Sequence, residues 1–336
     1  MGQTRRSCRG GGKASTQRIK TFEKESSSLV SSLSAKNLKV YKENPHLRQV
    51  FAEGRVPETR EMVQAEDRYL KDSDPTRDYT EAKRAKTVEH LGQRKLLLSE
   101  IEFLTHNWKP GDTVVYAGSA PGSHLPILAE MFPGIKMILY DPHKFDPKAR
   151  SVTKSIYQEF FTDKVAIKLA SSVAPGTMLF VSDIRTEPTD AGVTKDMAMQ
   201  KKWIEIMKPR KSLLKCRLPY GAGKFTYFKG KFWIQCFAPQ TSTETRLEIE
   251  GVPDLVEYDN KKYEDQMFYF NTMKRTMYYK HRMTGLGYDH CYDCAAEIFI
   301  LREYTKSKFT SLTLEDLKKK IDSTMVPLFT SFKKED

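Results

Sequence analysis

A glycine turn and a strand-end carboxylate indicate a site for a nucleotide-like ligand. The apolar segment 113–117 runs directly into Gly118, and Gly122 follows with the spacing Gly-x-x-x-Gly. Asp141 ends the next apolar segment, where a carboxylate can accept hydrogen bonds from both hydroxyls of a ribose. Because the spacing is not the Gly-x-Gly-x-x-Gly of dinucleotide sites, it favours an adenosyl ligand over NAD. The alternative is that the two glycines form only a tight turn.

Two further charged residues belong to the same group of segments. Asp183 ends a third apolar segment and is therefore expected to point into the same crevice. Lys215 lies inside the otherwise apolar segment 212–217, where a buried lysine is costly unless it is paired. Desolvation lowers the pKa of a lysine, so that Lys215 could act as a base. Alternatively, Lys215 lies on an edge strand and reaches solvent.

Alternating strands and helices are needed to bring these residues together. The predicted strands and helices, in chain order, are a helix over 81–105, a strand over 113–117, a helix over 124–132, strands over 137–141 and 178–183, a helix over 196–207, a strand over 212–217 and an antiparallel pair over 231–237 and 245–250. This alternation is typical of an α/β sheet that is buried on both faces. We also expect a helix over 58–70 and a mostly helical region after residue 250, with a C-terminal helix over 314–321.

Charge and composition divide the 336-residue chain unevenly. The net charge is +13, and residues 1–48 alone hold 11 Lys/Arg against 3 Asp/Glu. Residues 1–40 are predicted to be a disordered basic tail that contacts polyanions, or alternatively a solubilising leader. We assign 41–80 to a helical N-terminal extension, 81–310 to the main domain and 311–336 to a C-terminal helix and tail.

The sequence also excludes several classes of protein. It has no apolar run of about 18 residues, so we expect no membrane span, and no apolar stretch follows the Arg-rich N-terminus as in a signal peptide. Five widely spread cysteines favour free thiols in a reducing compartment, cytoplasmic or nuclear, with the virion as a further location if the source is viral. Only one Cys-x-x-Cys pair is present, Cys291 and Cys294, so we expect no metal site.

Several of these segments resemble a known family, the poxvirus cap-specific mRNA nucleoside-2'-O-methyltransferases, which double as the stimulatory subunit of the viral poly(A) polymerase. The resemblance spans roughly residues 90–300, and we place no counterpart for the first 80 or so residues. It is carried by residues 92–98 (GQRKLLL), 114–124 (VVYAGSAPGSH), 182–185 (SDIR), 215–220 (KCRLPY) and 237–247 (FAPQTSTETRL). It implies a Rossmann-like S-adenosylmethionine-dependent methyltransferase fold, with a mostly parallel central sheet, antiparallel C-terminal strands and helices on both faces.

The resemblance also implies the catalytic residues. The family's tetrad falls on Lys95, Asp183, Lys215 and Glu244. In this assignment Lys215, flanked by the cation Lys95, accepts the proton of a ribose 2'-hydroxyl as its oxygen attacks the methyl group of S-adenosylmethionine, while Asp183 and Glu244 orient the two lysines. No metal is required.

The resemblance further implies which residues bind the cofactor. They are Gln93, Tyr116, Gly118, Gly122, Asp141, His143, Phe161 and Asp183. His143 and Phe161 stand where the family has arginine and valine. A histidine can still contact the ligand, and Phe161 needs only to pack against adenine.

Recognition of the cap is implied for a third group of residues. They are Arg217, Tyr220, Ser242, Thr243, Glu244 and Glu264. Tyr220 offers a stacking face to the cationic methylguanine and Glu264 an acid to its edge. Ala222 and Thr241 stand where a second acid and a stacking tyrosine are expected, which leaves the second stacking face unassigned. Tyr263, Phe268 and Tyr269 are its candidates, although an aromatic cluster is more often core.

Three functions follow as hypotheses. The first is cap 2'-O-methylation, with capped mRNA as substrate and a poly(A) polymerase catalytic subunit or other capping enzymes as partners. The second is an RNA-binding processivity factor of a poly(A) polymerase with secondary methyltransferase activity. The third is an FtsJ-like rRNA 2'-O-methyltransferase, which shares the tetrad. The complete tetrad argues against a dead enzyme, and Tyr220 with Glu264 favours the cap family over the rRNA enzyme.

Overall fold

The computed structural model describes residues 58–80, 92–153, 155–239, 241–283 and 290–332. The predicted basic tail lies outside these residues. By its internal contacts the chain divides into two compact units, Val63–Asn271 with Ala296–Asp336, and Met1–Met62 with Thr272–Ala295. Within the described residues, every helix is too short or too polar to cross a bilayer.

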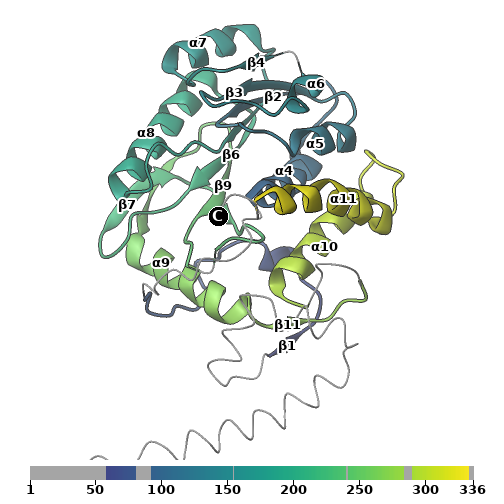
Figure 1. Cartoon of the computed structure of the whole chain (residues 1–336). Helices are drawn as coiled ribbons and strands as arrows, with labels where there is room; N and C mark the ends of the chain where they lie inside the picture. The colour runs from purple at the N-terminus through teal and green to yellow at the C-terminus, as the bar shows by residue number, and fades with distance from the viewer. Residues whose placement is uncertain (1–57, 81–91, 154, 240, 284–289, 333–336) are drawn as a thin grey trace, which may run out of the picture. The chain divides into compact units, whose positions relative to one another are not determined.

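A seven-stranded sheet forms the centre of the larger unit (Figure 1). The order of the described strands is β4-β3-β2-β5-β6-β9-β8. Five strands run parallel: β4 (Ile156–Tyr157), β3 (Lys136–Tyr140), β2 (Thr113–Ala117), β5 (Met178–Ser182) and β6 (Lys211–Cys216). Strands β9 (Thr245–Glu250) and β8 (Lys231–Trp233) complete the sheet in antiparallel fashion. The predicted fold class is therefore confirmed.

Helices cover both faces of this sheet because its central strands are apolar on both sides. Figure 1 shows α7 (Asp163–Ser172) and α8 (Asp190–Met207) along one side, and α4 (Gly92–Asn107) and α5 (Leu125–Met131) along the other. A short helix, α6 (Ala149–Val152), lies beside α5. Threonine hydroxyls cap α7 and α8 by accepting a main-chain N–H from the first turn, which fixes where each helix begins.

The register of the sheet brings the carboxyl ends of its parallel strands together. Ala117 at the end of β2 pairs with Tyr140 of β3 on one side and with Ser182 of β5 on the other. The residues that follow these three strand ends therefore lie side by side. Lys215 near the end of β6 stands directly opposite Arg246 of β9, so these two side chains share one face of the sheet.

The remaining elements surround this core. In the larger unit, β7 (Lys224–Phe228) pairs antiparallel with β10 (Leu255–Asp259), and α9 (Asn260–Tyr269) follows. A π-helical turn, η2 (Phe270–Lys274), continues α9, and the last helices are α10 (Tyr292–Thr305) and α11 (Leu314–Phe332). In the smaller unit, β1 (Thr59–Arg60) pairs in parallel with β11 (Tyr278–Tyr279).

The helix predicted over residues 58–70 is wrong. The described chain there contains β1 and a single 3-10 turn, η1 (Ala65–Asp67). Leu70 donates its N–H to the carbonyl of Phe232 in β8, and the Arg68 carbonyl accepts the N–H of Ile234. The guanidinium of Arg68 forms two hydrogen bonds with Glu102. Pairing with the sheet edge and a buried ion pair thus override the helix propensity of this charged segment.

Candidate active site

The four residues of the predicted tetrad lie together at the carboxyl end of β5 and β6. The Nζ atom of Lys95, on α4, lies 3.3 Å from Oε1 of Glu244. The Nζ atom of Lys215 lies 3.7 Å from Oε2 of Glu244 and 3.2 Å from Oδ1 of Asp183. Glu244 therefore connects the two lysines, and Lys215 connects the two carboxylates.

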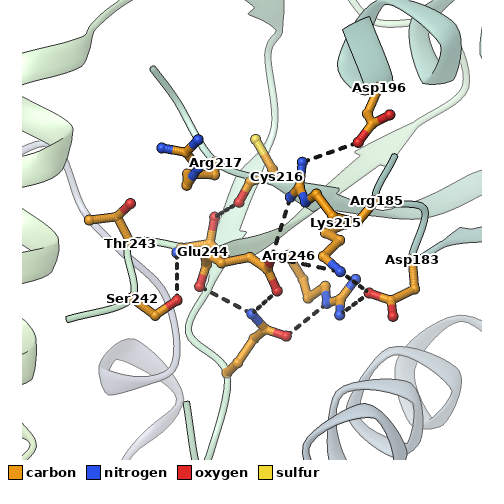
Figure 2. A network of polar contacts seen from close by, with 12 residues as sticks. Asp183, Arg185, Asp196, Lys215, Cys216, Arg217, Ser242, Thr243, Glu244 and Arg246 are labelled. Carbon is orange, nitrogen blue, oxygen red and sulfur yellow. Dashed lines mark hydrogen bonds and ion pairs between the residues drawn. The ribbon is translucent and has the colours of Figure 1, made fainter. Parts of the chain in front are cut away.

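Two arginines and a glutamine that sequence reasoning did not single out complete this cluster (Figure 2). Arg246 donates to Oδ1 of Asp183 at 2.5 Å and, through Nε, to the amide oxygen of Gln235 at 2.9 Å. Gln235 in turn donates to Oε1 of Glu244 at 3.2 Å. Arg185 bridges Glu244 and Asp196, each at 3.3 Å. Asp183 and Glu244 are thus connected through Arg246 and Gln235, and Arg185 holds Glu244 as well.

The surrounding charges determine the ionisation of the cluster. Burial lowers the pKa of Lys95 from its ordinary value, and Arg246 and Lys215 lower it further. Burial opposes the ionised form of Asp183, but Arg246 and Lys215 hold its pKa below the ordinary value. The same opposition applies to Glu244, whose pKa the cations around it, led by Lys95, hold well below the ordinary value. Both carboxylates are therefore ionised at neutral pH.

These lowered pKa values predict a pH-dependent contribution to stability. A carboxylate with a lowered folded-state pKa stabilises the fold above its unfolded pKa, about 4.3 for a glutamate, and loses this effect as the pH falls through the folded value. We expect the free energy of unfolding of Glu244→Gln to be about 3 kcal/mol lower at pH 7, since two partly buried lysines lose a shared carboxylate partner. The difference in unfolding free energy between this variant and the wild type should narrow as the pH falls below about 4.3 toward 3.

Thermal and denaturant unfolding between pH 3 and 7 would test this. Glu250→Gln is the matched control, because Glu250 at the end of β9 pairs with Lys211 of β6 at the surface and its side chain is 77% exposed. This control should unfold like the wild type at every pH. A gap between wild type and Glu244→Gln that stays constant over the whole pH range would contradict the assignment of charges.

The predicted glycine turn follows β2 and approaches the tetrad closely. Gly118 has φ +80°, and a Cβ atom there would lie 2.8 Å from the main chain of Asp183 and Ile184. Gly122 also has positive φ, +67°. Because L side chains are disfavoured at positive φ and no space exists beside Asp183, a glycine is required at position 118. The turn therefore packs directly against the main chain of Asp183.

Asp141 lies on the neighbouring strand end, as predicted. Its Oδ2 accepts the N–H of Ala120 in the glycine turn at 3.1 Å, and its Oδ1 accepts the N–H of His143 at 2.8 Å. The His143 ring lies 2.9 Å from the same oxygen, while 85% of its side chain is exposed. Oδ2 therefore keeps a further lone pair for a ligand hydroxyl, whereas Oδ1 already has two partners on His143.

The other predicted cofactor residues differ in their contacts and in their burial. Gln93 accepts a hydrogen bond from Ser123, the residue after the glycine turn. Tyr116 is fully buried in β2. Phe161 packs in the core against Tyr140 and Trp203, with ring centroids 5.3 Å and 4.7 Å away. An adenine contact by Phe161 therefore remains a prediction.

Tyr220 and Glu264 adjoin each other beyond the tetrad. Tyr220 is 40% exposed, and the guanidinium of Arg217 lies 4.3 Å from its ring centroid. Arg217 also pairs with Asp190 at 2.7 Å. The buried carboxylate of Glu264 accepts the N–H of Gly221, the residue after Tyr220, at 2.7 Å. An exposed aromatic face thus stands beside a fixed acid.

A second aromatic ring faces Tyr220, and it is not one of the three candidates chosen from the sequence. Tyr79 lies 5.5 Å from Tyr220 between ring centroids, at an interplanar angle of 32°. Phe268 instead packs edge-on behind Tyr79 at 5.3 Å. Tyr263 is buried, with its hydroxyl bonded to the carbonyl of Thr243. No sequence signal singled out Tyr79, which stands alone in a charged segment.

The last two predicted RNA contacts, Ser242 and Thr243, directly precede Glu244. The hydroxyl of Ser242 accepts the N–H of Glu244 at 3.2 Å, which fixes the approach to β9. Thr243 is only 1% exposed. The structure therefore presents Ser242, but not the Thr243 side chain, toward solvent.

Comparisons with known proteins agree with the resemblance. A model of the family described as Poly A polymerase regulatory subunit matches residues 66–324. The cap-specific mRNA (nucleoside-2'-O-)-methyltransferase of Myxoma virus (strain Lausanne) is 30% identical over 249 residues, covering 66% of this chain and 74% of the relative. The fowlpox virus (strain NVSL) protein of the same name is 35% identical over 208 residues, covering 55% and 68%. The match from residue 66 corrects our statement that the first 80 or so residues have no counterpart.

A solved structure was also found to be similar. Bluetongue virus VP4, described as a multifunctional RNA-capping production-line, superposes on 78% of this chain with a TM-score of 0.40 and 14% identity. The superposition covers 44% of that protein, so this chain spans less than half of its length.

Proposed function

The chain belongs to the family of poly A polymerase regulatory subunits, and on that premise we propose that it methylates the ribose 2'-hydroxyl of a nucleotide near the 5' cap of mRNA. The observation that carries the proposal is the contact chain Lys95–Glu244–Lys215–Asp183 beside the glycine turn. Two relatives that share at least 30% identity with the chain carry the name of this activity. The residue roles below are part of the proposal.

Lys215 is the proposed base for the 2'-hydroxyl. A ribose hydroxyl is a weak nucleophile, and it must lose its proton as its oxygen attacks carbon. Asp183 at 3.2 Å and Glu244 at 3.7 Å hold the Lys215 amine from two sides, which fixes its position. Lys95, Arg246 and Arg185 pair with the same two carboxylates, so the groups around the Lys215 amine are themselves held in place.

The residues at the carboxyl ends of β2, β3 and β5 fit S-adenosylmethionine, which when bound would supply the activated methyl group. Gly118 lets the glycine turn lie directly against the main chain of Asp183, where a Cβ atom would collide. Oδ2 of Asp141 has a lone pair for a ribose hydroxyl of an adenosyl group. We assign the cofactor contacts to these residues together with Gln93 and Gly122, while the buried Tyr116 supports the site from within β2. The protein's contribution is then orientation of the two reactants.

The cap guanine is proposed to stack between Tyr79 and Tyr220. A ring held between two aromatic faces needs about 7 Å between them, twice the contact distance of about 3.5 Å. The present 5.5 Å between the ring centroids means that a small outward movement of Tyr79 or Tyr220 admits it. Glu264, fixed by the N–H of Gly221, is the proposed acid at the edge of the guanine. A methylated guanine is cationic, so both features favour it over an unmethylated one.

The test is transfer of labelled methyl from S-adenosylmethionine to short RNAs that differ only at the 5' end. The three ends are a 7-methylguanosine cap, an unmethylated cap and a triphosphate. We expect transfer to the RNA with the methylated cap, at a rate well above that for the other two. Equal transfer to all three would contradict cap recognition and favour an rRNA-type enzyme.

A role with a poly(A) polymerase is the second candidate, and the description of the family favours it. We propose a poly(A) polymerase catalytic subunit as a protein partner of this chain. The same transfer assay separates the two functions, because RNA binding without any methyl transfer would leave the regulatory role as the better account.

A further inference from the structure

A buried polar chain joins two of the side chains assigned to the cofactor. The hydroxyl of Tyr116 donates to Oε1 of Glu100 at 2.7 Å. The other oxygen of Glu100 lies 2.9 Å from Nε2 of His124. On its far side, Nδ1 of His124 lies 2.8 Å from Oε1 of Gln93, which also accepts the hydroxyl of Ser123 at 3.0 Å. The chain therefore runs without a gap from β2 through α4 to the start of α5.

Three members of this chain have no access to a ligand, since Glu100, His124 and Tyr116 are 2%, 0% and 1% exposed. Gln93 is partly exposed and is the member that can contact one. Burying a carboxylate or an imidazole costs free energy unless it is hydrogen-bonded. We therefore ask which groups Glu100 and His124 bond to. Both ring nitrogens of His124 and both oxygens of Glu100 have partners within this chain.

We propose that Glu100 and His124 are positioning residues that set the affinity for the adenosyl cofactor by fixing Gln93 and Tyr116 against the glycine turn. The proposal rests on the proposed function, since it assumes the cofactor site beside Gly118. Ser123 directly follows Gly122, so the hydrogen bond from Ser123 ties Gln93 on α4 to that turn. Loss of either central residue would break the connection that holds the Gln93 amide in place through His124.

The state of Tyr116 supports this arrangement. Burial and the neighbouring Glu100 raise the pKa of Tyr116 well above its ordinary value. The phenol therefore keeps its proton, and its single O–H is committed to Glu100. The orientation of Tyr116 thus depends on the carboxylate behind it.

Helix α4 offers a matched control for Glu100. Glu102 lies two residues further along, is also buried at 6% exposure, and pairs with Arg68 through two hydrogen bonds. In the described structure Glu102 makes no hydrogen bond to Gln93, Tyr116 or His124. Glu100→Gln and Glu102→Gln are therefore the same chemical change in the same helix, and only the first interrupts the chain to the cofactor residues.

The experiment measures the Kd of S-adenosylhomocysteine by calorimetry on the full chain, with KM for S-adenosylmethionine and kcat alongside. Glu100→Gln is expected to raise both Kd and KM about tenfold, because the amide offers one acceptor oxygen in place of the two that face Tyr116 and His124. Its kcat at saturating cofactor should stay close to the wild-type value because Glu100 does not touch the tetrad. Glu102→Gln should lower Tm while leaving Kd unchanged.

Two results would overturn the inference while the proposed function stands. One is a Kd for Glu100→Gln within twofold of the wild type, and the other is an equal rise in Kd for Glu100→Gln and Glu102→Gln. If Glu100→Gln fails to fold, Tyr116→Phe, which removes only the hydroxyl, must raise Kd in its place. A wild-type chain that binds no S-adenosylhomocysteine would overturn the proposed function, and this inference with it.

Discussion

Replacement of Lys215 by alanine is expected to lower methyl transfer to capped RNA by about a thousandfold while RNA binding stays nearly intact. A positioned general base contributes about 10²–10⁴ to a rate, and no other described amine lies between Asp183 and Glu244 in the same way. Single-turnover transfer at saturating cofactor is the measurement, because it reports the chemical step and not product release.

The matched control is Lys211→Ala, at the other end of β6. Lys211 pairs with the exposed Glu250 at 2.9 Å and has no contact with the tetrad in the described structure. Its transfer rate should equal that of the wild type. A Lys215→Ala variant that transfers methyl within a fewfold of the wild-type rate would rule out Lys215 as the base. Lys95, whose pKa burial lowers, would then be the next candidate.

The second large effect is expected from Tyr79→Ala and Tyr220→Ala on binding of the cap. Stacking of a base on an aromatic side chain contributes about 1–3 kcal/mol, so each variant should bind RNA with a methylated cap about 10- to 100-fold more weakly. Binding of the same RNA with a 5' triphosphate should change little. Fluorescence titrations with the two RNAs, performed in the same salt, give this ratio directly.

Conservative variants separate stacking from other roles of these tyrosines. Tyr79→Phe keeps the ring and loses only the hydroxyl, which lies 3.4 Å from the Thr241 carbonyl. It should retain most of the preference for the cap. Equal weakening of capped and uncapped RNA by Tyr79→Ala would show that Tyr79 supports the fold or the RNA backbone and does not stack on the guanine.

The sequence predicts the sheet and one half of the site well, for physical reasons. Parallel strands buried on both faces are continuous apolar runs, so their ends, and the residues that follow them, can be read directly. Gly118, Asp141 and Asp183 were located in this way, and the register of the sheet places them side by side. Lys215 stood out because a lysine is unusual in an apolar strand.

The other half of the site depends on pairing that no local pattern reveals. Glu244 was assigned from the family resemblance alone, and it reaches the lysines because β9 returns antiparallel to β6. Arg246 lies opposite Lys215 in the same pairing, and only this register discloses that the two share a face. Charged residues alternate with the others along β9, so Arg246 does not stand out in the sequence.

For residues 58–80, local sequence predicts the wrong structure. Its charged residues favour a helix by propensity, but Arg68 and Leu70 bond to the edge strand instead, and Tyr79 comes to face Tyr220. Both outcomes depend on residues more than 130 positions away in the chain. Local propensity contains no information about such partners.

The most direct test of the account is to locate the transferred methyl group. RNA with a 7-methylguanosine cap, methylated by the wild-type chain with labelled cofactor, would be digested to nucleosides and analysed by mass spectrometry. We expect the label on the ribose 2'-oxygen of a nucleotide near the cap, and no label with the Lys215→Ala variant. Label on a base, or label that persists in Lys215→Ala, would contradict it.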